Sequence, residues 1–516
     1  MQNKSILMVA AENDALPGAK VGGVADVLRD LPLALKQKGY KVQSIIPSYG
    51  MLARLPEAKF AGQIYVEFAG QQQLVTFYRY QHDGADAWIA DHPRFSPQGE
   101  KIYCHDDDSA PFATDATKYA FFCMVVAEAL KQDFLPMPDI VHAHDWHAAF
   151  LLILMSLAPQ YVKLSHIQTV FSIHNLAMQG VRPFRGEESS FERWYPKIIV
   201  DPRIIADPNY PHCMNPMRAG IAIADKVHTV SPSYAEEIQQ RSDHALGIYG
   251  GEGLENDLRA RAAQGQLFGI LNGCNYDGFK ATKALAKTTL VKLLQQSVLN
   301  WAASERQLRT AHWLADKRIA AWAASKKKKV LMTSVGRVTE QKVRLMTSSM
   351  LDGRSALGAM LEHGGSELVF LMLGSGDVQL ERELVKISAE HENFIFLNGF
   401  APAIADQLYA QGDLFLMPSS FEPCGISQLL AMREGQPCLV NSVGGLKDTV
   451  EHNVTGFSFT GDNEGAQAWA MLKCFEQCFD LVKERGKQYQ SIKANATAAR
   501  FSWDAVVDEY AEKLYC

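Results

Sequence analysis

The sequence predicts an α/β protein made of two Rossmann-like, doubly wound domains that face a central cleft. Short β-branched or apolar runs alternate with amphipathic stretches along the chain, which is the pattern of parallel strands joined by helices. This alternation occurs in two series, one before residue 281 and one after residue 329. The length of 516 residues fits two large domains, or about three of average size.

The first series supplies the strands of an N-terminal domain. Its predicted strands lie within residues 5–11, 42–47, 139–144, 168–174 and 226–230. Each run ends in polar residues, where a strand would meet its loop. Because ligands of open α/β sheets bind beyond the carboxyl ends of the strands, these loops are the first candidates for a site.

The second series starts after a segment of different composition. Its predicted strands lie within residues 330–337, 367–377, 393–400, 414–419, 437–442 and 456–461. The segment before it is rich in Ala, Lys and Gln, has apolar residues at helical spacing and closes with four consecutive lysines. We therefore expect an N-terminal domain (1–280), a helical Lys-rich connection (281–329), a C-terminal domain (330–500) and a last helix that crosses back to the first domain (501–516).

Composition narrows the class of protein. Hydrophobic residues at 47% and charged residues at 21% are typical of a folded chain. The 51 Lys and Arg against 57 Asp and Glu give a net charge of −6, so nucleic acid is not an expected partner. The longest apolar stretch, residues 148–159, is well short of the ~20 residues that span a bilayer, so no membrane partner is expected.

The cysteines and the first residues indicate a cytoplasmic location. The nine cysteines are an odd number without the spacing of a disulfide framework, which fits a reducing compartment. Residues 1–13 are too short in apolar content for a signal peptide. Cys474 and Cys478 lie on one predicted helix, but no second pair of ligands follows at a suitable spacing, so we expect no metal there.

The first glycine-containing turn follows the first predicted strand and opens a helix. The segment KVGGVADV places Lys20, Gly22, Gly23 and Asp26 at this turn. Two glycines there allow backbone amides to approach a phosphate at a helix N-terminus. The third glycine of a dinucleotide fingerprint is absent. A structural tight turn beside a solvated lysine explains the same residues equally well.

Polar residues also end two further strands. The segment HAHDWHA at residues 142–148 holds three histidines with Asp145. They could bind a metal, but alternate strand positions point to opposite faces, so we favour a hydrogen-bonding wall of a sugar pocket, with Trp146 as an apolar face or plain core. His174 stands where a ligand-facing loop should begin, although a satisfied core histidine fits equally. Asn272 lies in an Asn-Gly turn, which also has a purely structural interpretation.

The second half carries two cations and one carboxylate at strand ends. Arg337 and Lys342 follow the first strand of that half, where a fork of donors and a compact charge suit a diphosphate. Glu422 begins the loop after a later strand; Gly425 is expected to open one helix, and the pair at 444–445 another. Two helix N-termini beside a carboxylate would hold phosphates with their dipoles and a sugar with the acid. Surface solvation explains either cation taken alone.

In combination these motifs resemble the bacterial glycogen synthases and plant starch synthases, retaining glucosyltransferases of glycosyltransferase family five. The resemblance runs nearly end to end, through KVGGVADV, HAHDWHA, SIHNLAMQG, TVSPSYAEEI, GILNGCNYD, FEPCGISQLLAMREG, VGGLKDTV and FSWDAVVDEY, in the family's order. It implies the GT-B fold, with an acceptor-side first domain and a nucleotide-sugar-binding second domain. It also implies ADP-glucose as donor, an α-1,4-glucan such as glycogen as acceptor, and no cofactor.

The resemblance further implies a role for each candidate residue. The catalytic set is Asp145, His174, Arg337, Lys342 and Glu422. The donor-binding set is Lys20, Gly22, Gly23, Asp26, Asn272, Cys424, Gly425, Gly444 and Gly445. The two cations would neutralise the departing diphosphate while the acceptor 4-hydroxyl attacks the same face, without an obligatory metal or covalent nucleophile.

Three features depart from the family. Val443 stands where the family often has Thr, and Val343 where it commonly has Gly. Residues 281–329 look longer than the usual connection. The alternatives are a GT-B glucosyltransferase with another nucleotide-glucose donor or a small acceptor, and a catalytically weak glucan-binding homologue. The presence of Lys20, both cations and the carboxylate favours an active synthase.

Overall fold

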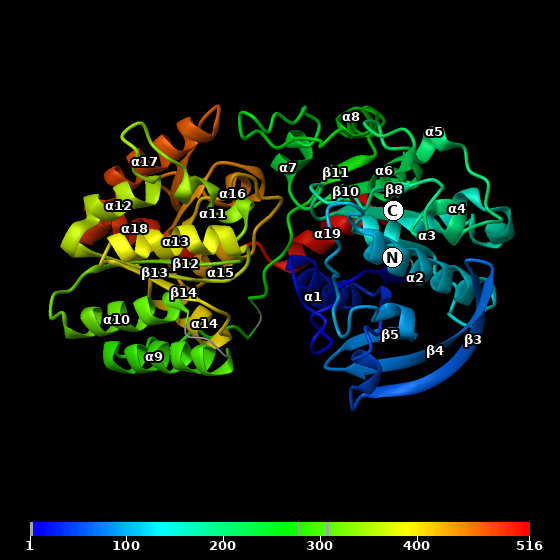
Figure 1. Cartoon of the computed structure of the whole chain (residues 1–516), viewed down its shortest axis with the longest axis horizontal. Coiled ribbons are helices and arrows are strands. Elements are labelled where there is room, and N and C mark those ends of the chain that lie inside the picture. The colour runs from blue at the N-terminus through cyan, green and yellow to red at the C-terminus, as the bar shows by residue number, and fades with distance from the viewer. Residues whose placement is uncertain (1–3, 277, 306–308) are drawn as a thin grey trace. The chain divides into compact units, whose positions relative to one another are not determined.

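The computed structural model describes residues 4–276, 278–305 and 309–516, and it divides the chain into two compact units (Figure 1). Unit 1 comprises the residues up to Ser242 together with Gly250–Gly273 and Ser502–Cys516. Unit 2 comprises Asp243–Tyr249 and Cys274–Phe501. Each unit has its own sheet and its own hydrophobic core.

Within the described residues, the main sheet of unit 1 has nine strands in the order β11-β10-β7-β6-β1-β2-β5-β4-β3. Their bounds are β1 Ser5–Val9, β2 Lys41–Pro47, β3 Ala58–Phe68, β4 Gln71–His82, β5 Ala85–Asp91, β6 Ile140–His144, β7 Gln168–Ile173, β10 Lys226–Thr229 and β11 Leu267–Gly269. The strands from β11 to β5 are parallel, whereas β4 pairs antiparallel with both β3 and β5. The hairpin β3–β4 therefore extends one edge of a Rossmann-like sheet.

Helices cover both faces of this sheet. They are α1 Gly23–Gln37, α2 Ala113–Lys131, α3 Asp145–Leu157, α4 Phe191–Trp194, α5 Pro202–Ile205, α6 Pro216–Ile223, α7 Pro232–Glu237, α8 Glu255–Ala263 and α19 Trp503–Lys513, with 3-10 turns at Leu52–Arg54, Pro93–Phe95 and Pro159–Leu164 and a small sheet of β8 Arg182–Pro183 and β9 Cys213–Met214. In β1, Leu7 and Val9 join the core of α2 and α3, and Ile6 and Met8 join that of α1 and α19. Because side chains alternate along a strand, a strand buried on both faces has a continuous apolar sequence.

The sheet of unit 2 is entirely parallel, in the order β14-β13-β12-β15-β16-β17. Its strands are β12 Val330–Val335, β13 Leu368–Gly374, β14 Phe394–Asn398, β15 Leu414–Met417, β16 Cys438–Asn441 and β17 Gly456–Phe459. Its helices are α9 Lys287–Ser304, α10 Thr310–Ala324, α11 Glu340–Thr347, α12 Ala356–Gly364, α13 Val378–Glu390, α14 Pro402–Gln411, α15 Ser427–Arg433, α16 Gly444–Thr449, α17 Glu464–Glu484 and α18 Lys487–Ala498, with a 3-10 turn at Gly365–Glu367. The prediction of two doubly wound, Rossmann-like units is thus confirmed.

The strand orders locate the ligand-binding edge of each unit. In unit 2 the chain winds from β12 outward to β14 and then returns to β15 on the other side. In unit 1 it winds from β1 to β5 and returns to β6. Such sheets bind ligands beyond the carboxyl ends of the two strands at which the order reverses. The loops after β1 and β6, and those after β12 and β15, are therefore the places for a site.

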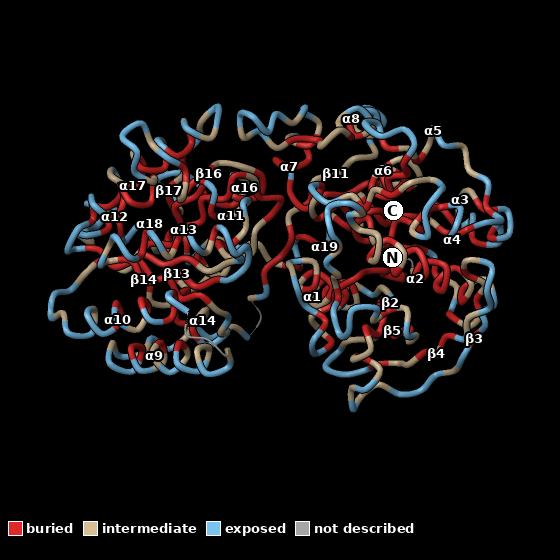
Figure 2. The backbone as a smooth tube through the Cα atoms, in the orientation of Figure 1, coloured by how far each residue is buried: buried red, intermediate tan, exposed pale blue. Residues whose placement is uncertain are grey.

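The segment expected to connect the domains is instead part of unit 2. Within residues 281–329, Lys287–Ser304 forms α9 and Thr310–Ala324 forms α10, while residues 306–308 lie outside the described residues. Leu290, Leu294 and Ile319 of these helices pack with Leu371 and Ile395 of the sheet, so the apolar spacing seen in the sequence covers one sheet face. Figure 2 shows this arrangement, with buried strands β13 and β14 beside helices whose other sides are exposed. The boundary between the units accordingly falls after Gly273.

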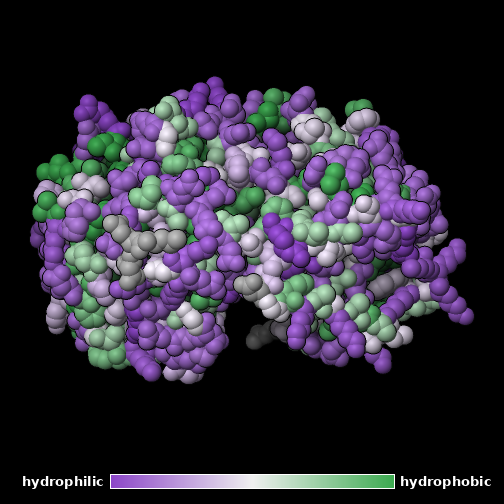
Figure 3. All heavy atoms as spheres, turned by 180° about the vertical axis from the view of Figure 1, so that it is seen from behind, coloured by the Kyte–Doolittle hydropathy of each residue, from purple (hydrophilic) through white to green (hydrophobic). Residues whose placement is uncertain are grey.

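The hydropathy of the surface and of the helices agrees with what the composition predicts. On the face shown in Figure 3 both units are mainly hydrophilic, and hydrophobic residues occur in small groups. Among the described residues, none of the helices has the length and apolar content needed to cross a membrane.

Candidate functional site

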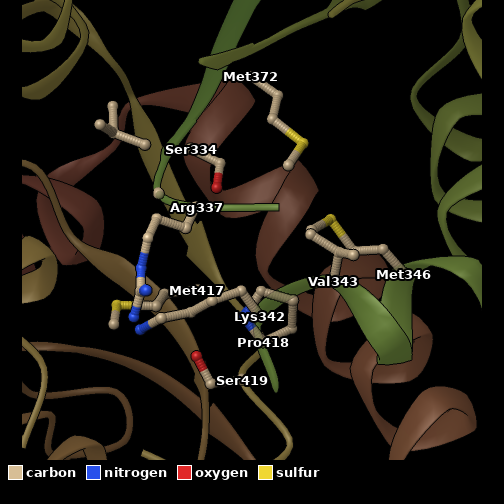
Figure 4. Close-up of a pocket in the computed structure, with 11 residues that line it drawn as sticks. Ser334, Arg337, Lys342, Val343, Met346, Met372, Met417, Pro418 and Ser419 are labelled. Atoms are coloured by element: carbon tan, nitrogen blue, oxygen red, sulfur yellow. The ribbon is translucent and has the colours of Figure 1, made fainter. Parts of the chain in front are cut away.

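The loops after β12 and β15 form the candidate site of unit 2. Arg337 and Lys342 line a small cavity together with Ser419. Figure 4 shows the two cationic groups lying side by side, with the hydroxyl of Ser419 close to them. Arg337 follows β12, Lys342 lies in the first turn of α11, and Ser419 follows β15. The strand order therefore brings two positive charges to the edge at which a parallel sheet binds its ligand.

Glu422 is the carboxylate of this site. It is 6% exposed, its Oε2 forms an ion pair with the Nζ of Lys342, and it accepts a hydrogen bond of 2.9 Å from the hydroxyl of Ser419. Its backbone oxygen accepts from the N–H of Gly445 at 3.0 Å. A buried carboxylate requires such partners because an unpaired charge in the interior is costly. The ion pair between Lys342 and Glu422 brings two of the predicted catalytic residues into contact.

Glycine at position 445 is required by close packing. A side chain there would meet the carbonyl oxygen of Cys424 at 2.2 Å and its Cα at 2.5 Å. Gly444, with a φ of +44°, is the first residue of α16, as predicted. Gly425 has a φ of +78°, but the helix expected to open there begins at Ser427. The loop Cys424–Gly425 is therefore held against the start of α16 by contacts that only glycine permits.

The loop after β1 contains a carboxylate that the sequence did not single out. Glu12 is 2% exposed and accepts hydrogen bonds from the N–H groups of Val21 at 2.6 Å and Gly22 at 2.5 Å, and from the hydroxyl of Tyr103 at 2.6 Å. Gly22 precedes the first residue of α1, Gly23. One of the amides expected to face a phosphate, that of Gly22, thus donates to Glu12 in this structure. No spacing rule connects positions ten residues apart, so the sequence held no signal for this contact.

Lys20 is held beside the same turn by two acidic side chains. Its Nζ lies 3.1 Å from Asp14 and 2.6 Å from Asp26. Partial burial disfavours the charge, but the hydrogen bonds and charges of Asp26 and Asp14 outweigh it and raise the pKa of Lys20. Its side chain remains 43% exposed. The ammonium is therefore fixed in place and accessible.

Asp145 and His174 are brought together at the carboxyl ends of β6 and β7. Asp145 opens α3 with a φ of +58°, a left-handed conformation that non-glycine residues rarely adopt. Its Oδ1 accepts a hydrogen bond of 2.7 Å from the backbone N–H of His174. Burial raises the pKa of Asp145 to about 7 and lowers that of His174 to about 3. The imidazole is thus neutral near neutral pH.

Two family models match the sequence of this chain. Residues 5–260 match the family model of the starch synthase catalytic domain, and residues 329–477 match that of glycosyl transferases group 1. A glycogen synthase of Desulfitobacterium hafniense is 30% identical over 98% of either chain, and one of Streptococcus mutans is 30% identical over 99% of either chain. The chain belongs to the glycogen synthase family. It is therefore a glycosyltransferase.

Solved structures show the same fold. The catalytic domain of starch synthase IV from Arabidopsis thaliana, bound to ADP and acarbose, has a TM-score of 0.76 and 25% identity, with 99% of each chain covered. Sucrose-phosphate synthase from Thermosynechococcus elongatus has a TM-score of 0.56 at 16% identity, with 99% of this chain and 98% of that chain covered, and supports the fold alone. The GT-B fold predicted for this family member is confirmed.

The sequence predicts that the histidines of the HAHDWHA segment divide between opposite faces of the sheet, and for the two strand histidines this is wrong. His142 and His144 are two residues apart on β6 and share one face, where their rings stack at 4.2 Å. His147 lies in α3, where its ring centroid is 4.1 Å from that of Trp146 with 30° between the ring planes. Trp146 itself is buried core. In the described parts of the chain, no group of three or more His, Cys, Asp or Glu is arranged to hold a metal ion.

The remaining candidate positions are Asn272 and the two departures from the glycogen synthase family. Asn272 is buried in unit 1, and its Oδ1 has no hydrogen-bond partner among the described residues. Val343 is fully buried in the core of unit 2 and lines the cavity beside the cations. Val443 caps the start of α16 and supplies no side-chain hydrogen bond. The valine at 343 thus contributes to the wall of the candidate site.

Proposed function

We propose that this chain transfers glucose from ADP-glucose to the non-reducing end of an α-1,4-glucan, with retention at the anomeric carbon. The observation that carries the proposal is the pair of cations, Arg337 and Lys342, beside the buried Glu422 at the switch point of unit 2. The starch synthase IV relative with ADP and acarbose bound supports ADP as the nucleotide and a glucan as the acceptor.

The cations supply the main catalytic effect. As the bond between glucose and diphosphate breaks, negative charge grows on the phosphate oxygens. Arg337 and Lys342 are held in place before the reaction, so they stabilise this charge without reorganising. In this structure Lys342 is paired with Glu422; we propose that the diphosphate takes the place of this carboxylate, which then accepts hydrogen bonds from glucose hydroxyls.

Unit 1 supplies neutral hydrogen-bonding groups. The low pKa of His174, about 3, means that its ring acts as a hydrogen-bond partner and not as a cation at neutral pH. Asp145 fixes the backbone of His174, and Lys20 adds an accessible positive charge. We propose that these groups orient glucose and the acceptor hydroxyl for attack on the face from which the diphosphate leaves.

No metal, cofactor or covalent nucleophile is part of the proposed reaction. The charge of the leaving group is met by the side chains already named, and positioning with electrostatics accounts for the catalysis. None of the cysteines in the described parts of the chain forms a disulfide, which supports a reducing compartment such as the cytoplasm as the place of action.

The test is incorporation of radiolabelled glucose into glycogen by the purified protein, with ADP-glucose and UDP-glucose in parallel. We expect incorporation from ADP-glucose and its loss in Glu422→Ala. Incorporation only from UDP-glucose would contradict the donor, transfer to glucose or maltose but not to glycogen would contradict the acceptor, and glycogen binding without transfer from either donor would indicate a non-catalytic homologue.

A further inference from the structure

A row of buried imidazoles crosses one face of the sheet of unit 1. Its members come from three neighbouring strands: His142 and His144 from β6, Ser172 from β7 with His174 just beyond that strand, and His228 from β10. Residues two apart on a strand share a face, and Ser172 is paired in register with both His144 and His228. Tyr515, which follows α19, closes the row and is 1% exposed.

Hydrogen bonds link one side of this row without interruption. The hydroxyl of Tyr515 lies 2.7 Å from the Nδ1 of His142, whose Nε2 lies 2.6 Å from the Oγ of Ser172. That Oγ lies 2.7 Å from the Nδ1 of His228, whose Nε2 lies 3.3 Å from the carbonyl oxygen of Ile270. Both ring nitrogens of His142 and of His228 therefore have a hydrogen-bond partner.

The direction of the hydrogen bonds follows from the two ends. The Nε2 of His228 lies 3.3 Å from both the carbonyl oxygen of Ile270 and the hydroxyl of Tyr510. A hydroxyl can donate or accept, but a carbonyl can only accept, so His228 carries its proton on Nε2 and accepts at Nδ1 from Ser172. Ser172 then accepts from the Nε2 of His142, and the Nδ1 of His142 accepts from Tyr515. The opposite direction would leave the buried hydroxyl proton of Tyr515 without an acceptor. Tyr515 thereby fixes the tautomer and the ring plane of His142.

The fixed ring of His142 restricts His144, which in turn contacts the candidate catalytic residue His174. Its ring stacks on that of His144 at 4.2 Å with 25° between the planes, and the Nδ1 of His144 lies 2.9 Å from the Nε2 of His174. The Nε2 of His144 is buried with no partner among the described residues. A buried N–H without an acceptor is rarer than a buried lone pair without a donor. His144 therefore donates to His174, which leaves His174 with its proton on Nδ1.

We propose that Tyr515 is a positioning residue for His174, acting through His142 and His144. The hydroxyl of Tyr515 holds the plane of His142, the stacked ring of His144 takes its orientation from that plane, and His144 keeps the Nδ1–H of His174 available as a donor to the sugar. The side chain needed for this lies in the segment 502–516, which packs on unit 1 beside α1 (Figure 1). The proposal rests on the proposed function through the role of His174.

The test compares Tyr515→Phe with Tyr195→Phe. Tyr195 is a matched control because it is also buried in unit 1 and donates one hydrogen bond of 2.7 Å, to the carbonyl oxygen of Ala120, away from the histidines. Hydrogen-bond partners behind metal-bound histidines are typically worth about 10- to 100-fold in metal affinity or activity, and we take the lower end as the scale for a partner behind His174. We expect kcat to fall about 10-fold in Tyr515→Phe with KM for the donor within about twofold, since the lost contact positions a group for the reaction step. Tyr195→Phe should keep kcat within about twofold of wild type.

Selective ¹⁵N labelling of histidine gives a readout that loss of stability alone would not move. We expect the wild-type His142 ring to be protonated on Nε2 and His174 on Nδ1, and both signals to shift in Tyr515→Phe but not in Tyr195→Phe. Equal kcat in the two variants, or unchanged His174 ring signals in Tyr515→Phe, would overturn the proposal. If wild type transfers no glucose, the proposed function fails, and the ¹⁵N signals still decide whether Tyr515 positions His174.

Discussion

Replacing Lys342 by alanine removes the cation that both pairs with Glu422 and faces the expected diphosphate. Glu422 is 6% exposed, and after the change the hydroxyl of Ser419 remains as its side-chain partner. Loss of one member of a buried ion pair costs about 3–5 kcal/mol. Because the side chain of Lys342 is 22% exposed and water can reach the site, we expect the lower end, about 3 kcal/mol of unfolding free energy.

The effect on activity is expected to be separate from the effect on stability. Removal of one preorganised donor at a site of developing charge costs about 3 kcal/mol, or about 100-fold in kcat/KM. In the double variant Lys342→Ala with Glu422→Gln, the buried site no longer holds an unpaired charge. We therefore expect the double variant to recover most of the lost stability and none of the lost activity.

The assay is glucose transfer from ADP-glucose to glycogen, with denaturant unfolding measured on the same preparations. Lys483→Ala is the matched control in unit 2, because Lys483 forms a 3.2 Å pair with Glu367 at the surface, where both side chains are exposed. Such pairs contribute less than about 1 kcal/mol. Transfer at the wild-type rate by Lys342→Ala would show that Lys342 does not stabilise the leaving group. A stability equal to that of Lys483→Ala would show that its pair with Glu422 contributes no more than a surface pair.

Three further predictions concern packing, pH and metals. Gly445→Ala should lower Tm and activity together, since the new Cβ would lie 2.2 Å from the carbonyl oxygen of Cys424; an unchanged Tm would show that the loop yields. Burial keeps five histidines neutral in the folded protein: His174, with a pKa of about 3, and four others with lowered pKa values. Below about pH 6.5 these histidines are protonated in the unfolded chain only. Each of them therefore lowers the free energy of unfolding by about 1.4 kcal/mol for every pH unit of acidification. Asp145, whose pKa is raised to about 7, binds its proton more readily in the folded protein and so has the opposite effect, but it is one group against five histidines. Tm should therefore be lower at pH 5 than at pH 7.5. A Tm that rises on acidification would show that the buried histidines do not determine the pH dependence. Dialysis against a chelator should leave the transfer rate unchanged, and a loss restored by a divalent cation would show that the reaction needs a metal.

The fold was largely predictable because its strands are buried on both faces. Parallel strands covered by helices give continuous apolar runs, and the predicted runs overlap β1, β2, β6, β7 and β10 in unit 1 and the six strands that the structure describes in unit 2. The segment 281–329 was misassigned as a connection, since helical spacing reveals an apolar face but not the surface that it covers. Its partner is the sheet face of β13 and β14, which lies some 50 to 100 residues further along the chain.

The sequence could predict the site residues that directly follow a strand. It could not predict the contacts between residues far apart in the sequence. Arg337 and Lys342 follow a strand, and the strand order is enough to bring them to the ligand-binding edge. The hydrogen bonds of Glu12 to the first glycine turn, and that of Tyr515 to His142, join residues whose separation follows no local period. Such contacts are set by tertiary packing alone.

The most direct test of retaining transfer is proton NMR of the first product formed from ADP-glucose and maltohexaose. Because Arg337 and Lys342 are proposed to meet the leaving diphosphate on the face from which the acceptor attacks, we expect a new α-1,4 linkage at the non-reducing end from the earliest time points. A β linkage, or a linkage to another hydroxyl, would contradict it.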